Sequence, residues 1–190
     1  YQVTKQSLGI KQETLIEVRE TTSLTPQKLR QTFIDVVAGD VVKNNQIFGL
    51  PLSVDTLVMF YNKDLFNNAG LPLPPNTWAE LQAFVKKLTF QDRTGKLIQS
   101  GAAMGTANNV EHAADLVSLL MMQNGAQMTS DNQGTFQRVP TTGDQIYNPG
   151  PEALRFYTDF ANPTKESYTW NADFPAGLEA FAQGKTAVAF

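Results

Sequence analysis

The chain has 190 residues, of which 42% are hydrophobic and 17% charged, with a formal net charge of −3, one histidine and no cysteine. This composition is that of an ordinary globular protein and argues against a disordered or collagen-like chain. The length suits one or two domains with a sizeable core. The lack of cysteine excludes disulfides, thiolate metal sites and cysteine nucleophiles. No apolar run approaches the roughly 20 residues of a membrane-spanning helix.

The charged residues also bear on partners. The 15 basic residues are scattered along the chain and are outnumbered by 18 acidic ones. A protein that binds a phosphate backbone needs basic residues gathered on one face or stripe. We therefore expect no nucleic-acid partner.

The first predicted helix runs from Thr25-Pro26 to Gly39, after a polar stretch, residues 1–24, that has no firm pattern. Thr is a favoured N-cap and Pro suits the first helical position. Glycine commonly ends a helix. The spacing predicts one continuous apolar face, formed by Leu29, Phe33, Val36 and Val37.

Two short strands are predicted next. A turn at Asn44-Asn45 precedes residues 46–52, and a second apolar run covers residues 57–61. Pro51 cannot donate to a strand ladder, so the first strand should end at a sheet edge or crossing. The second run, LVMFY, is typical of a buried strand.

The rest of the chain alternates helices with short apolar segments. A strand or tight turn is expected at 101–105, an aromatic loop at 168–174 and a closing strand at 186–190, with a polar excursion over 126–149. Such alternation indicates an α/β fold. Five helices are predicted: one over 63–68, capped by Asn62 and closed by Gly70; one from Thr77 to Leu88, with a Thr77–Glu80 capping box; one from Asn109 to Asn124; one from Gly150-Pro151 to Phe160; and one from Pro175 to Gly184.

Several motifs resemble catalytic or metal sites without meeting their requirements. Residues 184–186 (GKT) match the end of a phosphate-binding loop, but Glu179 stands where that loop needs glycine, and the segment leaves a helix instead of entering one. His112 lacks the partners of a zinc site or a catalytic triad. Residues 131–134 lack the spacing of a calcium loop. We interpret these as a helix C-cap, a first-turn histidine and a turn.

Polar and aromatic side chains at element ends are the remaining candidates. Asp55 lies between the two predicted strands and is either solvated in a turn or directed into a cleft. Capping explains one of Asn108 and Asn109 and leaves the other over. Trp170, followed by Asn171, either packs on its own domain or offers an open ring face. An aromatic face with amide and carboxylate groups is what a neutral sugar requires.

The sequence resembles a known family in several blocks. Residues 48–66 (FGLPLSVDTLVMFYNKDLF), 69–71 (AGL) and 77–81 (TWAEL) are similar to the signature of the extracellular solute-binding proteins of family 1, which include the maltose- and oligosaccharide-binding components of ABC importers. Residues 181–188 (FAQGKTAV) resemble a later helix-to-strand segment, with Val188 in place of the usual Met. Residues 105–109 (GTANN) resemble a ligand-side loop. The resemblance covers about residues 25–190.

The resemblance implies an α/β, periplasmic-binding-protein-like two-lobed fold of type II, with a hinge near residues 53–56. Residues 1–52 would be part of the first lobe, ending in the hinge strand, and residues 53–190 would be most of the second. Both lobes are expected to be incomplete, because the family's first strands and its C-terminal return are not found in the sequence.

The resemblance also implies a function. We expect a non-enzymatic binding component of an ABC importer that captures a small neutral solute, a sugar or oligosaccharide, between its lobes, with no cofactor and no metal. Its partners would be the ligand and an ABC permease. It would be a monomer, extracytoplasmic, and tied to the membrane only by an anchor preceding this sequence. The alternatives are a binding protein for a polyamine, iron or a phosphate ester, or a glycoside-acting enzyme. The ligand-binding residues implied by position are Ser53, Asp55, Asn108, Asn109, Trp170 and Asn171.

Overall fold

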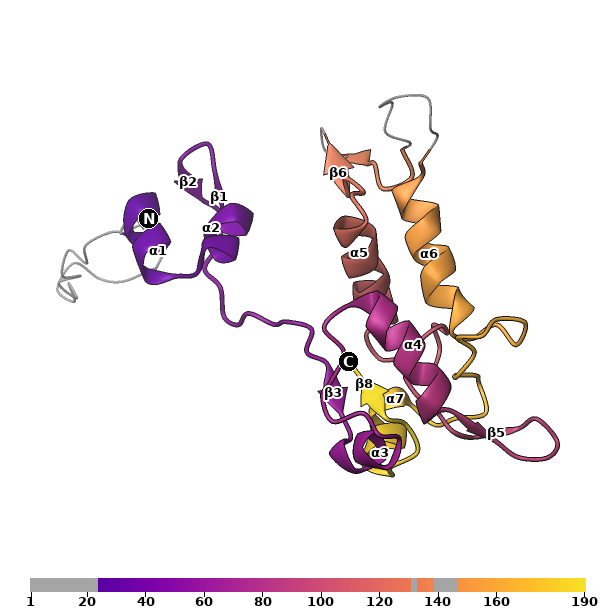
Figure 1. Cartoon of the computed structure of the whole chain (residues 1–190). Helices are drawn as coiled ribbons and strands as arrows, with labels where there is room; N and C mark the ends of the chain where they lie inside the picture. The colour runs from indigo at the N-terminus through magenta and orange to yellow at the C-terminus, as the bar shows by residue number, and fades with distance from the viewer. Residues whose placement is uncertain (1–23, 131–132, 139–146) are drawn as a thin grey trace, which may run out of the picture. The chain divides into compact units, whose positions relative to one another are not determined.

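The structure, a computed structural model, describes residues 24–130, 133–138 and 147–190 (Figure 1). The chain divides into two compact units, Tyr1–Asp55 and Thr56–Phe190, each with its own hydrophobic cluster. The division falls within the predicted hinge. Residues 1–23 of the predicted polar stretch and residues 131–132 of the turn predicted at 131–134 lie outside the described residues.

The first unit contains two short helices and a hairpin. These are α1 (Pro26–Thr32), α2 (Asp35–Val41), β1 (Val42–Lys43) and β2 (Gln46–Ile47). The predicted N-cap is confirmed, because the backbone N–H of Lys28 donates to the Thr25 hydroxyl at 3.2 Å, with Pro26 at the first helical position. The Asn44-Asn45 turn is also confirmed. Both residues have positive φ, 51° and 57°, as a two-residue hairpin turn between antiparallel strands requires.

The single helix predicted over 25–39 is wrong. The chain becomes extended at Phe33 and Ile34, and α2 then continues through Gly39 to Val41. In a straight helix Leu29 and Val37 would stand about 12 Å apart along one face, at 1.5 Å per residue, and could not pack on each other. The break folds α2 back, so that Leu29, Val37 and Ala38 form one buried cluster.

The strand predicted over residues 46–52 is much shorter than expected. Only Gln46–Ile47 pairs with β1, and one further bond, from Phe48 N–H to the Val41 carbonyl, extends the pairing. No strand is assigned between Phe48 and Met59 in the structure. Phe48, Leu50 and Leu52 are strongly exposed along this connection. Beyond Phe48 this segment therefore keeps the apolar pattern of a strand, but no second strand pairs with it among the described residues.

The second unit is a helical layer with short strand pairs. β3 pairs antiparallel with β8, β4 with β5, and β6 with β7. Residues 100–103 run beside 185–188 through bonds that include Ser100 N–H to the Lys185 carbonyl and Ala187 N–H to the Ser100 carbonyl, both at 2.9 Å. The elements are β3 (Phe60–Tyr61), α3 (Lys63–Asn68), α4 (Trp78–Leu88), β4 (Phe90–Gln91), β5 (Leu97–Gln99), α5 (Ala113–Gln123), β6 (Thr129–Ser130), β7 (Gln133–Gly134), α6 (Pro149–Asp159), α7 (Gly177–Ala182) and β8 (Val188–Ala189).

The predicted caps of this unit are confirmed. The Asn62 side-chain oxygen accepts from the N–H groups of Asp64 and Leu65 at 3.0 and 3.1 Å, and Gly70 follows α3 with φ +69°. The Thr77 hydroxyl accepts from Glu80 N–H at 3.1 Å. The Glu80 carboxylate reaches back to the N–H of Asn76, one residue before the cap, at 2.7 Å.

The core lies where α4, α5 and α6 meet the pairs formed by β3, β8 and residues 100–103. Leu81, Val85 and Leu88 of α4 are buried in this core, while Trp78 and Phe84 lie at its edge. α5 and α6 pack side by side (Figure 1). The largest fully buried side chains of the two units include Trp170, Phe66, Phe160, Leu81, Leu88, Met104 and Leu116.

Three further predictions for this unit need correction. The run 57–61 is not a buried strand, because only Phe60–Tyr61 pairs and Val58 and Phe60 are each 50% exposed. Alternate residues of the run pack on the core, as expected for a strand covered on one face. α5 begins at Ala113 instead of Asn109, and α7 at Gly177 instead of Pro175.

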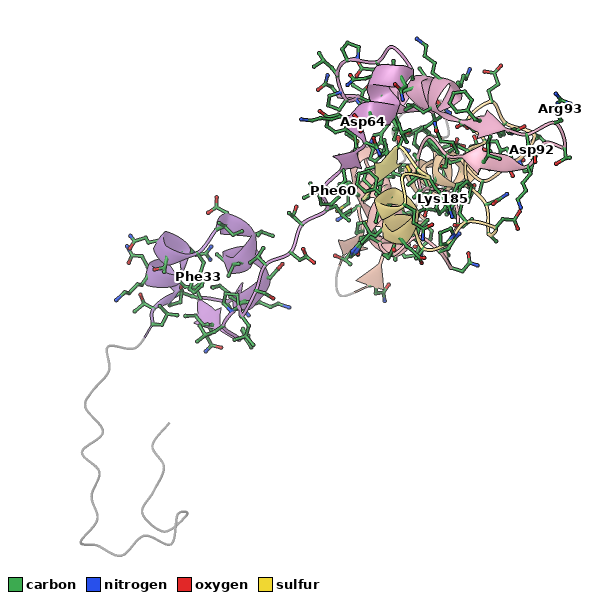
Figure 2. The ribbon with its side chains drawn as sticks, turned by 90° about the horizontal axis from the view of Figure 1, so that it is seen from below. Phe33, Phe60, Asp64, Asp92, Arg93 and Lys185 are labelled. Atoms are coloured by element: carbon green, nitrogen blue, oxygen red, sulfur yellow. The ribbon has the colours of Figure 1, made fainter. Side chains whose placement is uncertain are left out.

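The hairpin of β4 and β5 was not predicted. Asp92 organises its turn, since its carboxylate accepts from Thr94 N–H at 2.8 Å and Lys96 N–H at 3.0 Å, and Gly95 has φ +85°. The hydrogen bond from the Thr94 hydroxyl lowers the pKa of Asp92. Asp92 and Arg93 mark the tip of this hairpin (Figure 2). The sequence signal was an acidic residue three positions before a glycine.

No helix within the described ranges is long and apolar enough to span a bilayer.

Replacing Gly101 with Ala should destabilise the second unit. An added Cβ would stand 2.7 Å from the Val85 Cα, inside the core, where the α4 backbone cannot yield. Overpacking of this kind costs about 1–3 kcal/mol. The measurement is the free energy of unfolding in urea, followed by circular dichroism.

Gly134→Ala is the matched control. The new methyl group would meet only the Phe136 ring, at 3.5 Å. Its effect should stay within about 0.5 kcal/mol. If the two variants unfolded at the same urea concentration, the close approach of the new Cβ to Val85 would not reduce the free energy of unfolding.

Candidate functional site

Three of the predicted ligand residues lie together in the second unit. The loops at residues 105–112 and 168–177 are joined by hydrogen bonds among Thr106, Asn109, Trp170 and Asn171, which we call the Asn109 cluster. The residues are separated by about 60 positions in sequence, so tertiary structure alone brings them together. Asn109 is thus in direct contact with Trp170 and Asn171.

The Asn109 amide is the centre of this cluster. Its Nδ2 donates to the carbonyl oxygens of Asn171, at 3.0 Å, and Phe174, at 3.1 Å. Its Oδ1 accepts from the Thr106 hydroxyl and from the indole N–H of Trp170, the latter at 3.1 Å. Both ends of the amide are therefore used inside the protein. This use explains why α5 does not begin at Asn109, since the side chain joins loops and does not cap a helix.

Trp170 does not offer the open ring face that the sequence suggested. Its side chain is fully buried, and its ring stacks on Phe174 with centroids 4.6 Å apart and planes 10° from parallel. The indole N–H donates to both Thr106 and Asn109 at 3.1 Å. Of the two interpretations left open above, packing on its own domain is the one the structure shows. The physical reason is that burial with a satisfied N–H removes a large apolar surface from water.

Asn171 and Asn108 differ in their surroundings. The Asn171 side-chain oxygen accepts from Asp173 N–H at 3.0 Å, and its amide nitrogen donates to the Tyr168 hydroxyl at 3.2 Å. Asn108 is exposed on the loop before α5. A ligand contact by either residue stays a prediction.

Ser53 and Asp55 belong to the first unit, at its C-terminal end. Both are exposed in the connection between β2 and β3. The resemblance placed both residues in the second lobe, and the hinge that it implied at 53–56 stays a prediction. Their contact with a ligand stays a prediction.

Tyr157 of α6 holds the Asn109 cluster in place through its hydroxyl. This residue was not identified from the sequence. Its hydroxyl donates to the Thr106 carbonyl at 2.7 Å. Burial raises the pKa of Tyr157 to about 12. Nothing local in the sequence indicated the partner of its hydroxyl, which lies 51 residues earlier.

The two loops present an electrostatically neutral to acidic surface. Residues 105–112 and 168–177 contain no Lys or Arg, and their charged side chains are Glu111 and Asp173, with His112 able to gain a proton. The Glu111 carboxylate accepts from Leu178 N–H at 3.0 Å. This surface is suited to hydroxyl groups more than to an anion.

Of the rejected motifs, Gly184 has the role expected at a helix end, whereas His112 is the N-cap residue just before α5 and not a first-turn histidine. Gly184 follows α7 with φ +68°, as a helix C-cap does. The His112 ring lies 3.2 Å from the Asp115 carboxylate on the surface. Among the residues that the structure describes, no group of three potential metal ligands is found.

Tyr157→Phe should flatten the alkaline loss of stability. Below pH 10 the phenol is neutral in both states. Between pH 10 and about 12 the unfolded chain loses its proton while the folded chain keeps it. The free energy of unfolding should therefore fall by roughly 1–3 kcal/mol across this range in the wild type. Urea titrations at both ends of the range measure the difference.

Tyr61→Phe serves as the control and should keep the wild-type decline, because Tyr157 is still present. The Tyr157 variant should also be less stable at neutral pH, since the Thr106 carbonyl loses its donor. A decline of equal size in both variants would mean that other groups cause the alkaline loss.

Comparison with known proteins gives a family match over most of the chain. The family of bacterial extracellular solute-binding proteins matches residues 20–190. No solved structure resembles the chain at a significant level.

Named relatives match over shorter segments. The sn-glycerol-3-phosphate-binding periplasmic protein UgpB of Salmonella typhimurium is 33% identical over 106 residues, covering 54% of this chain and 22% of that protein. UgpB of Yersinia enterocolitica is 35% identical over 80 residues, or 40% of this chain and 16% of its own length. A protein of Brucella abortus (strain 2308) whose name calls it a binding protein is 39% identical over 56 residues, or 30% and 14%.

The match therefore spans less than a quarter of each relative. The mixture of helices and short strands fits an α/β solute-binding fold. The match of the family covers residues 20–55 of the first unit and all of the second unit. The chain belongs to the bacterial extracellular solute-binding protein family.

Proposed function

We propose that this chain is part of the substrate-binding component of an ABC importer and that it captures a small neutral solute, a sugar or oligosaccharide. The observation that carries the proposal is the family match over residues 20–190. In this proposal the protein binds its ligand and catalyses no reaction. It works outside the cytoplasm as a monomer, hands its ligand to an ABC permease, and meets the membrane through that permease or an anchor.

Capture would occur between two lobes of a type II fold. Residues 1–52 would contribute to one lobe and 53–190 to the other, with the hinge at 53–56. A ligand that contacts both lobes binds the closed state better than the open one and so shifts the population toward closure. The connection at the proposed hinge, residues 48–59, carries no strand in the structure, which suits a segment that must change its dihedral angles.

The proposed ligand contacts are Ser53, Asp55, Asn108 and Asn171. Each of these has a hydroxyl, carboxylate or amide group, and such groups bind sugar hydroxyls through directed hydrogen bonds. We assign Asn109 and Trp170 to holding the loops, because the Asn109 amide nitrogen donates two bonds and the indole N–H donates to two oxygens inside the protein. The Asn171 amide nitrogen, which has two N–H groups, donates one bond, to Tyr168.

The lack of Lys and Arg in both loops supports a neutral ligand. A phosphate group is bound most strongly by charge-assisted hydrogen bonds from Arg or Lys or by several backbone N–H groups. Glu111 and Asp173 would oppose an anion at this surface.

A phosphate ester is the second candidate. Its support is the similarity to two relatives named as sn-glycerol-3-phosphate-binding proteins. In that case the cations that bind phosphate would have to come from outside residues 105–112 and 168–177. Polyamine, iron and glycoside-acting alternatives have no comparable support.

Isothermal titration of the protein with glucose, maltose and sn-glycerol 3-phosphate tests the proposal. We expect saturable heat with a sugar. Asp55→Ala should weaken that binding by about 1–3 kcal/mol, because a carboxylate that bonds buried hydroxyls is lost.

Asp40→Ala is the control, since Asp40 is an exposed acid on α2 of the same unit. It should leave the affinity unchanged. Saturable binding of sn-glycerol 3-phosphate alone would select the phosphate-ester candidate. If Asp55→Ala kept the wild-type affinity but was less stable, Asp55 would have a structural role in a turn and would not contact the ligand.

A further inference from the structure

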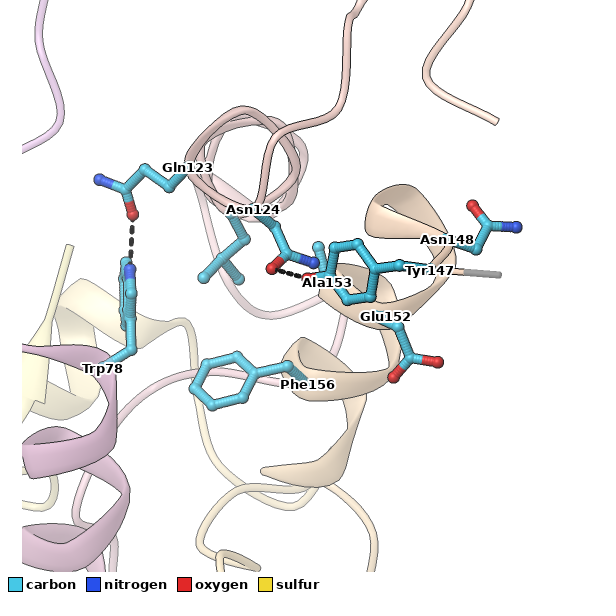
Figure 3. A pocket seen from close by; sticks show the side chains of 9 residues that line it. Trp78, Gln123, Asn124, Tyr147, Asn148, Glu152, Ala153 and Phe156 are labelled. Carbon is cyan, nitrogen blue, oxygen red and sulfur yellow. Dashed lines mark hydrogen bonds between the residues drawn. The ribbon is translucent and has the colours of Figure 1, made fainter. Parts of the chain in front are cut away.

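A cavity of about 600 Å³ lies wholly within the second unit, apart from the Asn109 cluster. It is bounded by the N-terminal end of α4, the C-terminal end of α5 and the first half of α6 (Figure 3). It shares no residue with the proposed ligand contacts. Its lining consists of Trp78, Leu120, Gln123, Asn124, Tyr147, Asn148, Glu152, Ala153 and Phe156.

The Trp78 indole is held rigidly at one wall. Its N–H donates to the Gln123 side-chain oxygen at 2.6 Å, a bond visible in Figure 3. Its ring contacts Phe156 nearly edge to face, with centroids 6.2 Å apart, and Phe190 at 5.8 Å. Unlike Trp170, it is only half-buried. The cavity thus has a fixed aromatic wall that a ligand can reach.

The opposite wall is polar and also fixed. The Asn124 amide nitrogen donates to the Pro149 carbonyl at 2.9 Å, and its oxygen accepts from the Tyr147 hydroxyl. This pair orders the Tyr147 ring beside the cavity (Figure 3). The Glu152 carboxylate adds an acceptor, with Arg155 3.7 Å away.

The electrostatics of the cavity favour a ligand without net charge. No Lys or Arg lines it. The C-terminus of α5 contributes partial negative charge and the N-terminus of α6 partial positive charge, and the two fields oppose each other. Glu152 is the one ionisable acid of the lining, and Arg155 offsets its charge. Neither an anion nor a cation would gain much electrostatic binding energy in this cavity.

These features together match a sugar ring. Aromatic faces cover its C–H groups, while a carboxylate and amides bond its hydroxyls, which both donate and accept. The combination that the sequence analysis sought at Trp170 is therefore present at Trp78. We propose that the cavity formed by Trp78, Gln123 and Glu152 is a second carbohydrate site. Because it lies in one unit, it needs no closure between lobes and stands independently of the capture proposed above.

The two indole N–H groups provide a direct test by ¹⁵N–¹H correlation spectroscopy of the chain. Trp78 and Trp170 are its two tryptophans, and Trp170→Phe identifies which signal is which. Maltose is added up to about 10 mM, which saturates a site with Kd near 1 mM. We expect the Trp78 signal to shift saturably and the Trp170 signal to stay in place, which also shows that the fold is intact.

Glu152→Gln removes the carboxylate charge at nearly constant shape, and its exposed position should leave folding unchanged. We expect the Kd for maltose to rise about 10-fold. Glu179→Gln makes the same change on the exposed face of α7, outside the cavity, and should keep the wild-type Kd.

Other results overturn the proposal. A Trp78 signal that does not move with glucose or maltose excludes the site. A shift with tetramethylammonium chloride but not with maltose assigns the cavity to a cation instead. Movement of the Trp170 signal as well reports binding beside the Asn109 cluster, and the Trp78 shift then supports the cavity only if its Kd rises in the Glu152 variant. Equal Kd values for the Glu152 and Glu179 variants remove the carboxylate from the site.

Discussion

The hydrogen bonds of a single amide, that of Asn109, fix the geometry of the candidate ligand surface. This side chain joins two loops about 60 residues apart, with two donated and two accepted bonds. Removing a buried partner of such a network leaves the remaining groups unsatisfied, which costs more than the bond itself contributes. The exposed residues of the loops, among them Asn108, can have a defined position only because Asn109 and Trp170 are committed to the interior.

The two tryptophans show how burial divides structural from exposed aromatic rings. Trp170 is fully buried, stacks on Phe174 and has its N–H satisfied, so it contributes to the core. The Trp78 N–H is also satisfied, by Gln123, yet Trp78 borders a cavity. Residue type alone does not distinguish the two, since both follow polar or proline-rich segments. What distinguishes them is how many elements cover each ring.

The charge pattern connects the family assignment with ligand chemistry. The chain belongs to a family of solute-binding proteins, and its relatives include proteins named for glycerol phosphate. The loops around Asn109 and the cavity at Trp78 nevertheless lack basic residues and offer amides, hydroxyls and carboxylates. Such surfaces recognise hydroxyl groups by directed hydrogen bonds and gain little from net charge.

The sequence by itself determined the features that depend on neighbouring residues. The caps at Thr25, Asn62 and Thr77 and the Asn44-Asn45 turn were predicted because their hydrogen bonds and dihedral angles span two to four residues. The signature over residues 48–66 was enough to indicate the family. Tertiary structure decided the break at Phe33–Ile34, the burial of Trp170 and the start of α5 at Ala113. Each of these depends on contacts between segments that are distant in the chain, or on packing that turns a helix back on itself, and no local pattern encodes such a partner.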